Sequence, residues 1–484
     1  MDQDKFNTSY VIRISMVSAL GGLLFGYDWV VIGGAKPFYE LFFGIADSAA
    51  LKGWAMSSAL VGCLLGAITS GFLSDRWGRK KLLIMAALLF IVSAVGTGAA
   101  NSFNGFIFYR ILGGISIGLA SNLSPMYIAE VTPARFRGGF VSINQLTIVI
   151  GILMAQIANY LIANPVGETD TSAQILDSWN GQWGWRWMFW AENVPALIFF
   201  ILMWTVPRSP RWLVTKGKIE EAKNILKKIG GSGYASGSLS DIQYSIKMDA
   251  EHTPAGSKDI FQKKYIKIVV IGIVLAAFQQ WSGINIIFNY AEEIFTAAGY
   301  GVNDILFNIV ITGLINLIFT VIAMFTVDKW GRKPLLTFGA LSLAITYIIM
   351  GSLYFLEFQG LPLLILVLVG IACYAMSLAP VTWVVLSEIF PTRIRGKAMS
   401  FATVSLWSAS FLLTYSFPIL NDFIGASGTF WLYALICISG WFYIKRNLVE
   451  TKGKSLEAIE LELLGEVVEE DDKNKELIKD KLEV

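Results

Sequence analysis

Three carboxamides in the middle of an apolar run are the residues whose chemistry stands out most. Gln279, Gln280 and Asn285 lie in the stretch QQWSGIN, within an apolar run from about 265 to 288. A buried amide without a partner costs about 2–7 kcal/mol, so three in one membrane-length run need a polar environment. On a continuous helix Gln280 and Asn285 would point about 140° apart, which favours a polar cavity over one packed neighbour. Amides donate and accept hydrogen bonds, as a polyhydroxylated ligand requires, although amide contacts between helices are an alternative.

A carboxylate and a guanidinium lie in two other apolar runs. Asp28 comes late in a run over about 10–34, and Arg110 comes early in a run over about 105–129 that crosses in the opposite direction. At about 1.5 Å per residue, both lie roughly 8–9 Å from the outer ends of these runs. We therefore expect them to pair, and separating them would change the proton affinity of Asp28. A permanent structural ion pair is the alternative.

Three further carboxylates are candidates for proton transfer. Glu130 and Glu388 are weaker proton carriers than Asp28, because each lies at a helix end beside arginines. Glu192 lies just inside another apolar run, and its role stays open.

The composition is that of a membrane protein. Of the 484 residues, 55% are hydrophobic and 15% are charged, whereas soluble proteins average about 25% charged. The net charge of +2 gives no reason to expect nucleic acid as a partner. Cys63, Cys373 and Cys437 have neither metal-ligand nor disulfide spacing, and the only histidine, His252, lies in a polar segment. We expect no metal and no cofactor, with the proton as the only coupling ion, and the N-terminal sequence indicates no signal peptide.

About 20 apolar residues span a membrane, and the chain contains twelve such runs. The expected limits are 10–34, 53–74, 82–100, 105–129, 139–163, 186–206, 265–288, 303–327, 334–355, 361–387, 397–420 and 428–448. An even number of spans places both termini on one side of the membrane.

Lys and Arg gather in the loops of one side. They include Arg76, Lys81, Arg135, Lys329, Arg393 and Lys397, together with eleven Lys or Arg residues in 207–264. The loops of the other side are nearly free of Lys and Arg and carry Glu168, Asp170, Asp177, Glu292, Glu293, Asp304, Glu357 and Asp422. By the positive-inside rule both termini are cytoplasmic, and 207–264 is a cytoplasmic connection with an amphipathic helix over Lys216–Ile229.

Two motifs occur once in each half of the chain. The sequence DRWGRK at 75–80 returns as DKWGRK at 328–333, and ExxPxxxRG at 130–138 returns at 388–396. The offsets are 253 and 258 residues, and both motifs lie at the cytoplasmic ends of spans of the same rank. Opposite charges at these ends are expected to bridge helices and to clamp one half against the other. The expected gate residues are Asp75, Arg79, Glu130, Arg137, Asp328, Arg332, Glu388 and Arg395.

These motifs resemble those of the sugar porters of the major facilitator superfamily. Four further stretches support the resemblance: Arg110-x-x-Gly113-Gly114, QQxxGxN at 279–285, PRSPR at 207–211 and ETKG at 450–453. The likeness covers nearly the whole chain. It implies an all-α integral membrane protein of twelve transmembrane helices in two pseudo-symmetric halves, 1–206 and 265–448. Cytoplasmic helices over 207–264 would connect the halves, and 449–484 would form a cytoplasmic tail. Alternating access around a midplane site would follow.

The resemblance also implies which residues contact the sugar. They are Gln145, Gln279, Gln280, Asn285 and Trp383, with Phe25 and Asn316 as lesser members. Trp383 would offer an indole ring to the C–H face of a sugar. Taken singly, Trp383 is also typical of packing or an interfacial anchor, and Gln145 and Asn316 are also typical of contacts between helices.

The likeness is strongest to the proton-coupled xylose porters of the family, and five positions depart from the expected patterns. Ile152 and Leu406 replace glutamines of those porters, and Asn289 replaces a tyrosine. Arg208 stands where the family usually has Glu, and Val449 where it usually has Pro. D-xylose is therefore the first expectation for the substrate, with glucose, galactose and arabinose open.

The function that these features predict is import of a monosaccharide with protons, by a monomer in the bacterial inner membrane. A passive sugar facilitator is the alternative within transport. Asp28 favours proton coupling over it, because xylose porters resemble this chain in carrying Asp at that position whereas mammalian facilitators usually carry Asn. A membrane sugar sensor is the alternative from another class, although the tail after Lys454 has only about 30 residues. No P-loop, metal-site or catalytic-triad pattern is present, so we do not expect an enzyme.

Overall fold

The computed structural model describes residues 6–167, 170–251, 262–391, 394–454, 459 and 462–463. Within these ranges the regular structure is helical throughout. Four residues named above lie outside the described part of the chain: Glu168, His252, Arg393 and, for its side chain, Asp328.

The N-terminal half contains six spans. The first five are α1 (Thr8–Phe42), α2 (Ala49–Trp77), α3 (Arg79–Ala99), α4 (Phe103–Val131) and α5 (Arg137–Ile162). The sixth span is continuous from Asn180 to Thr205 and consists of η2 (Asn180–Gly184), α7 (Trp185–Ala191) and α8 (Asn193–Thr205). Two short elements, η1 (Ala134–Phe136) and α6 (Ser172–Asp177), lie in the connections.

The C-terminal half contains the other spans, two of which are broken. Its elements are α11 (Lys263–Trp281), α12 (Ile284–Asn289), α13 (Ala291–Ala297), α14 (Val302–Trp330), α15 (Arg332–Phe355), α16 (Leu361–Met376), α17 (Leu378–Ile389) and α18 (Arg395–Asn447). With 53 residues, α18 is far longer than one span, and Gly425 interrupts it with a φ of 71°. Two successive spans meet at this glycine, which gives the twelve spans that the sequence predicts.

The first helix is longer than its apolar run. We expected the span to end at about residue 34, but α1 continues to Phe42. The charge of Lys36 does not end the helix because Glu40, one turn later, lies 3.2 Å from it. The estimate that Asp28 lies roughly 8–9 Å from the outer end of its span is therefore wrong, because the helix continues beyond the apolar run.

Two helices connect the halves at one end of the molecule. They are α9 (Pro210–Thr215) and α10 (Ile219–Glu251), and α10 breaks at Gly230 and Gly231. Leu213, Leu226 and Ile229 form a small core with Val11 of α1. The helix that we predicted over Lys216–Ile229 is therefore present from Ile219 onward, with its apolar face packed on the N-terminal half.

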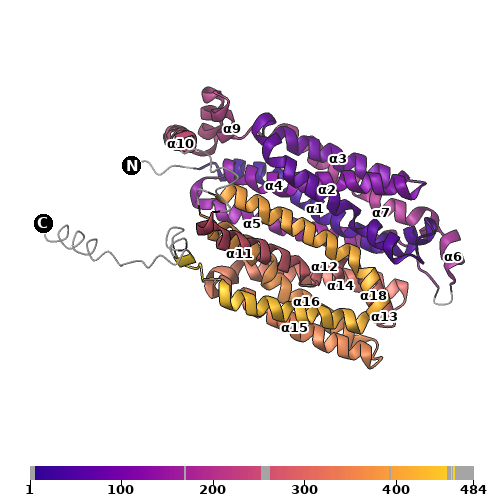
Figure 1. Cartoon of the computed structure of the whole chain (residues 1–484). Helices are drawn as coiled ribbons and strands as arrows, with labels where there is room; N and C mark the ends of the chain where they lie inside the picture. The colour runs from indigo at the N-terminus through magenta and orange to yellow at the C-terminus, as the bar shows by residue number, and fades with distance from the viewer. Residues whose placement is uncertain are drawn as a thin grey trace.

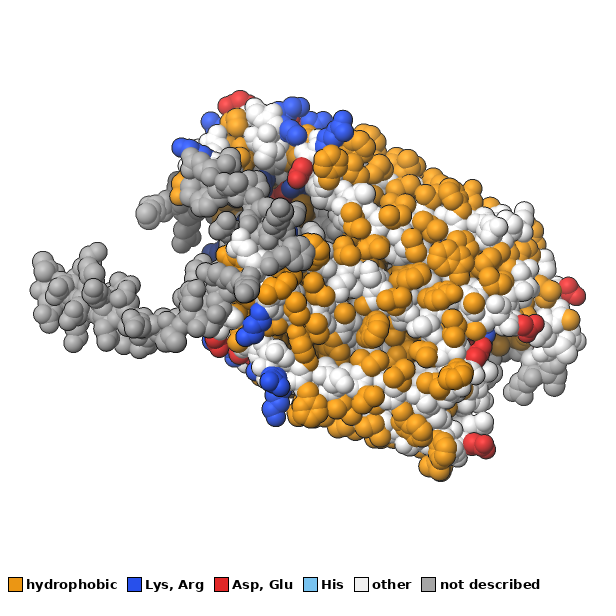
Figure 2. Space-filling view, viewed as in Figure 1, with side chains coloured by type: hydrophobic (Ala, Val, Ile, Leu, Met, Phe, Trp, Pro, Cys, Tyr) orange, Lys and Arg blue, Asp and Glu red, His pale blue; other side chains and the backbone are white. Residues whose placement is uncertain are grey.

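Figure 1 shows the two halves side by side, with α9 and α10 at one end. The halves touch along α2 with α18 and along α5 with α14. On the face in Figure 2, hydrophobic side chains cover the middle of the molecule. Most of the Lys and Arg side chains in that view lie near the end that carries α9 and α10, whereas Asp and Glu side chains are visible at both ends.

Candidate functional site

The amide stretch lies at a break in the seventh span. The helix α11 ends at Trp281, and Gly283 has a φ of 84°, a left-handed conformation that a side chain strains. A Cβ at Gly283 would lie 3.0 Å from the ring of Tyr433. Both the backbone and the neighbour therefore require glycine here, and the chain continues as the separate helix α12.

The break at Gly283 brings together amide side chains that we expected to point in different directions. Asn285 Nδ2 donates to Gln280 Oε1, and Gln280 Nε2 donates to Gln279 Oε1 at 3.2 Å. The estimate of 140° between Gln280 and Asn285 is wrong, because it assumed a continuous helix. The three amides, which we call the amide trio, are at most 9% exposed.

The amide trio is anchored on the other broken span. Gln279 Nε2 donates to the carbonyl oxygens of Leu378 and Ala379, at 3.4 and 3.3 Å, at the first turn of α17. Trp383 lies on the same short helix and is 37% exposed. The two breaks therefore place the trio and Trp383 on linked elements of one half.

The other expected sugar contacts lie on three further helices. Gln145 on α5 is half-buried, and Asn316 on α14 is 6% exposed. Phe25 on α1 packs against Trp29 and Trp407, each with ring centroids 6.0 Å apart. Within the part of the chain that the structure describes, no hydrogen bond joins Gln145, Asn316 or Trp383 to the amide trio.

The structure adds polar and aromatic residues that we did not predict. Trp407 of α18 also contacts Trp29 at 6.0 Å, so an aromatic group joins the two halves. Gln156 of α5 is 1% exposed, and neither end of its amide has a hydrogen-bond partner among the described residues. A Cβ at Gly313 of α14 would lie 1.8 Å from Gln156 Oε1, so this side chain fills the space between the halves.

Gln156 was detectable in the sequence. It lies four residues after Ile152, on the same face of α5, where we noted the loss of an amide. Gln156 therefore places an amide one helical turn away from Ile152.

Asp28 and Arg110 are in contact, as the sequence predicts. Arg110 Nη1 binds Asp28 Oδ1, and Arg110 Nη2 lies 3.5 Å from the Asp28 carbonyl oxygen. Both residues are at most 2% exposed. Asp28 Oδ2 has no hydrogen-bond partner among the described atoms, and a Cβ at Gly113 would come within 2.8 Å of it.

Glu192 belongs to the same buried group. It is 1% exposed, lies between α7 and α8, and interacts electrostatically with Asp28 and Arg110. Its Oε1 has no hydrogen-bond partner in the described structure. Two buried carboxylates therefore lie near one guanidinium, and the ion pair that the described residues show is that of Arg110 with Asp28.

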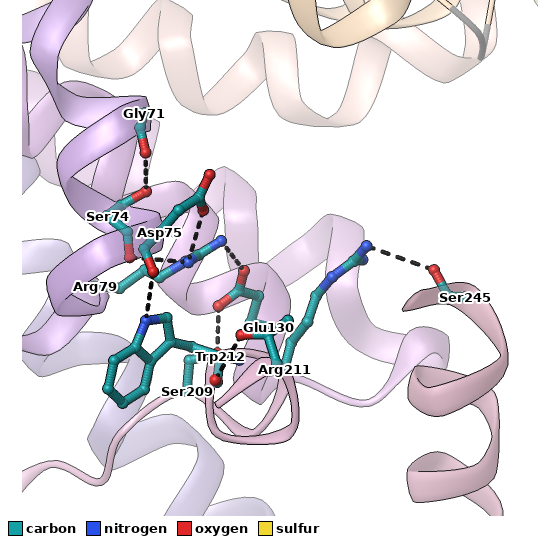
Figure 3. Close-up of polar contacts among 10 residues, drawn as sticks. Gly71, Ser74, Asp75, Arg79, Glu130, Ser209, Arg211, Trp212 and Ser245 are labelled. Atoms are coloured by element: carbon teal, nitrogen blue, oxygen red, sulfur yellow. Dashed lines mark hydrogen bonds and ion pairs between the residues drawn. The ribbon is translucent and has the colours of Figure 1, made fainter. Parts of the chain in front are cut away.

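The duplicated motifs form equivalent clusters at the end that carries α9 and α10. In the N-terminal half, Arg79 lies 3.0 Å from Glu130 and 3.3 Å from Asp75, and Ser209 donates to the other oxygen of Glu130 (Figure 3). Arg137 donates to the carbonyl oxygen of Ala129 at 3.1 Å. These contacts all lie within one half.

The C-terminal half repeats this arrangement. Arg332 lies 3.1 Å from Glu388, Thr451 donates to Glu388 at 2.6 Å, and Arg395 donates to the Phe390 carbonyl oxygen at 3.1 Å. The Arg79–Glu130 and Arg332–Glu388 pairs thus each lie inside a half. The clamp between halves that we expected from these residues stays a prediction.

Glu450 adds a cap to the C-terminal half that the described residues of the N-terminal half do not repeat. Its carboxylate accepts the backbone N–H groups of Arg332 and Lys333, both at 3.0 Å, at the start of α15. Burial acts to raise the pKa of Glu450, but the backbone N–H groups of Lys452, Arg332, Lys333 and Thr451 outweigh it and lower the pKa below its usual range.

The opposite end of the molecule is held by contacts that do cross between the halves. Lys36 of α1 binds Glu293 and lies 3.1 Å from Glu292, both on α13. Asn303 exchanges two hydrogen bonds with the backbone of Val166, at 2.9 and 3.0 Å. Sequence reasoning missed Lys36, although a lysine four residues before Glu40 at the end of an apolar run was a visible signal.

Comparison with known proteins agrees with this geometry. Residues 14–463 match the family described as "Sugar (and other) transporter". The chain is 40% identical to the D-xylose-proton symporter of Escherichia coli K12, over 94% of this chain and 96% of that protein. It is 39% identical to the arabinose-proton symporter of Bacillus subtilis, over 93% and 94%. The inward open conformation of the xylose transporter XylE from E. coli matches with a TM-score of 0.80 and 38% identity, over 93% of this chain and 99% of that one.

The fold and the duplicated clusters define a multi-pass membrane transporter of two helical halves. The chain belongs to the sugar transporter family of the major facilitator superfamily. The predicted family and fold class are confirmed.

Proposed function

We propose that this protein imports a monosaccharide together with protons by alternating access. The observation that carries the proposal is the buried group of Asp28, Arg110 and Glu192 in a chain of the sugar transporter family. The two similar proteins named above are both described as proton symporters. A facilitator needs no titratable group of this kind at its centre.

D-xylose is the substrate that we propose first. The amide trio, with Gln145 and Asn316, offers donors and acceptors to sugar hydroxyls, and Trp383 with Phe25 offers aromatic faces to the ring. Ile152 and Leu406 remove polar contacts, whereas Gln156 supplies an amide one turn away. An arabinose-proton symporter is nearly as similar to this chain as the D-xylose symporter, so a second pentose is the nearest rival.

The coupling would work through the shared guanidinium. While Arg110 binds Asp28, the two charges compensate each other, and Glu192 is the neighbouring buried carboxylate without an ion pair within 4 Å among the described residues. A conformational change that draws Arg110 away would leave Asp28 buried without a counter-ion, so Asp28 would take up a proton. Proton binding and the exchange between conformations would then be coupled, so that each changes the equilibrium of the other.

Residues 1–206 and 265–448 would move as two units, with 207–264 between them and 449–484 as a tail. The contacts at Lys36 and Asn303 close one end, and the ion pairs at the other end stay within each half. We propose that the closed end is extracellular and that both termini are cytoplasmic in the inner membrane of a bacterium. Cysteines placed near Lys80 and Lys333 should then react only with reagents that reach the cytoplasm.

Transport in proteoliposomes tests this function. With a proton gradient acid outside, labelled D-xylose should accumulate above its external concentration, and collapse of the gradient should abolish accumulation. Uptake that only equilibrates the sugar would show a facilitator, and sugar binding without any uptake would favour a sensor. If no unlabelled monosaccharide competes with D-xylose, the substrate class is wrong. We expect the monomer to suffice, with no metal or cofactor added.

A further inference from the structure

The Lys36 group, which consists of Lys36, Glu40, Glu292 and Glu293, joins the two halves with more acid than base. Lys36 is 1% exposed, and its Nζ lies 3.2 Å from Glu40 and 3.1 Å from Glu292, and also binds Glu293. The ring of Tyr290, which precedes α13, lies 5.8 Å from the same Nζ. Glu40 is on α1 with Lys36, whereas Glu292 and Glu293 lie in the first turn of α13 in the other half. Three carboxylates therefore meet one buried ammonium group at the interface between the halves.

Other titratable residues around this group compensate little of the excess acid. Lys52 of α2 interacts electrostatically with Glu40 and Glu292, but it forms no ion pair with them within 4 Å among the described residues. Asp304 is exposed at the start of α14, and Tyr354 of α15 donates to a backbone carbonyl oxygen of α13. With all its acids ionised, the group would hold three negative charges against the single positive charge of its ammonium. An uncompensated charge in a buried place is costly.

Two polar atoms of the neighbourhood have no partner. The hydroxyl of Tyr39, whose side chain is fully buried, makes no hydrogen bond among the described atoms. Tyr39 interacts electrostatically with Glu40, Lys36, Glu293 and Arg110. Glu293 Oε2 also lacks a hydrogen-bond partner in the described structure. A proton on Glu293 would remove one negative charge and give this carboxyl group a donor.

The pKa of Glu293 reflects the same imbalance of charge. The helix α13 lies in the connection between the seventh and eighth spans. Burial and the charges of Glu292 and Glu40, against the attraction of Lys36, raise the pKa of Glu293 to about 8. If the halves separate at this end, α13 would carry Glu293 away from Lys36 into water, where a glutamic acid has a pKa of about 4.3. Between these two values, the closed end binds a proton that the open end releases.

We propose that the Lys36 group is a second proton-binding site, which takes up a proton from the medium when the outer end closes and returns it to the same medium when that end opens. The inference rests on the proposed orientation, in which this end is extracellular. Because the site faces the same side in both steps, it adds no proton to those that cross with the sugar. It makes the balance between the two conformations depend on the external pH.

An acidic medium should therefore favour the closed outer end. The closed form has the raised pKa, so its additional stability is present well below pH 8 and is lost as the pH rises through about 8. Between the two pKa values, each pH unit changes the ratio of closed to open molecules about tenfold. From about pH 9 to about pH 6, this ratio should rise at least about tenfold.

Pulsed electron paramagnetic resonance on the full-length protein in nanodiscs measures this ratio. Spin labels at Asp47→Cys and Leu356→Cys report the separation of the halves at this end, and the longer distance should gain population at the higher pH. The measurement needs neither a sugar nor a proton gradient. A protein that fails to accumulate sugar but shows the pH response would contradict only the proposed function, and the reverse result would contradict only the second site.

The substitution Glu293→Gln makes the test specific, because the amide keeps the size of the side chain and cannot ionise. This variant should keep the short distance up to about pH 9. Glu292→Gln, which removes another acid of the group, should weaken the response and serves if Glu293→Gln does not fold. Asp304→Asn is the matched control, since it removes an exposed carboxylate, and it should respond as the wild type does. Asp28→Asn should also keep the response, because Asp28 belongs to the other proton site.

Three results would overturn the proposal. The first is a wild-type distance distribution that is the same at both pH values. The second is a response that Glu293→Gln and Glu292→Gln both leave intact. The third is a response that disappears in Asp28→Asn, since the pH dependence would then belong to the Asp28 group.

Discussion

Asp28 and Glu192 are two buried carboxylates that compete for the guanidinium of Arg110. Each buried charge needs a partner, because an uncompensated one is far more costly than a neutral acid. In the proposed mechanism, protonation of one of the two acids accompanies a movement of Arg110. This is the smallest arrangement that can link a proton to a helix movement.

Asp28→Asn should abolish accumulation of sugar against a gradient, since the amide keeps the size of the side chain but cannot take up a proton. Sugar binding should stay measurable, and exchange of labelled for unlabelled sugar can continue. Counterflow and gradient-driven uptake in the same proteoliposomes separate the two effects.

Asp304→Asn is the matched control, because Asp304 is exposed at the start of α14. It should leave accumulation unchanged. Uphill uptake that persists in Asp28→Asn would remove Asp28 from the proton path.

Gln280→Ala should weaken sugar binding by about 1–3 kcal/mol, or roughly 5- to 150-fold, because a hydroxyl and the partner amides lose a hydrogen bond. Trp383→Ala should cost a similar amount through lost ring contact. Competition binding with labelled D-xylose measures both.

Gln182→Ala is a suitable control, since Gln182 donates to the Leu176 carbonyl oxygen, away from the amide trio. Its affinity should equal that of the wild type. Unchanged affinity in Gln280→Ala would show that the sugar lies elsewhere.

The broken helices are the elements that arrange these residues. The seventh span breaks at Gly283 and the tenth at Ser377, and Gln279 of one reaches the carbonyl oxygens of the other. A continuous α11–α12 helix would separate Asn285 from Gln280. The break is therefore part of the site and not a local irregularity.

Gly283→Ala should damage the site through the backbone. A left-handed φ costs about 1–2 kcal/mol for a residue with a Cβ, and contact with the Tyr433 ring adds to it. We expect a lower Tm together with weaker sugar binding, measured by thermal unfolding with and without D-xylose.

Gly301→Ala is the control for this substitution, because Gly301 has a φ of −77° and open space around its Cα. It should change neither quantity. If Gly283→Ala binds D-xylose normally, the break is not needed for the site.

At the scale of the whole molecule, the two ends differ in the contacts that hold the halves together. Contacts between the halves at one end include Lys36 with Glu292 and Glu293, whereas the Arg79–Glu130 and Arg332–Glu388 pairs at the other end each lie within one half. A transporter that works by alternating access has to form contacts between its halves at one end while it breaks those at the other end. The Lys36 group therefore stabilises the conformation seen here over the opposite one.

Lys36→Met should shift the molecule toward the opposite conformation. Removing one partner of a buried ion pair costs about 3–5 kcal/mol, and here Glu40, Glu292 and Glu293 would all lose their cation. Spin labels at Asp47→Cys and Leu356→Cys, on the two halves at this end, should move apart in the variant.

Asp422→Asn provides the comparison, because Asp422 is an exposed charged residue of α18 at the same end and makes no ion pair within 4 Å in the described structure. It should leave the label distance unchanged. Equal distances in wild type and Lys36→Met would show that the Lys36 group does not hold the halves together.

Much of the architecture follows from local features of the chain. Lipid requires about 20 apolar residues for each crossing, so composition alone predicts the twelve spans, and the positive-inside rule predicts their direction. The duplicated motifs predict two equivalent halves, and the clusters at Arg79 and Arg332 have equivalent contacts. The chemistry of Asp28, Arg110 and the amides is visible for the same reason, since a polar group in an apolar run is conspicuous wherever the chain leads.

What only the tertiary structure decided is which polar groups meet. One dihedral angle, at Gly283, turned Asn285 toward Gln280, and no periodicity in the sequence encodes such an angle. Lys36 meets Glu293, and Gln156 meets Gly313, across more than 150 residues, because the two halves pack against each other. Spacing along a helix predicts neighbours within one or two turns. It carries no information on contacts between halves, since these depend on how the two bundles fit together.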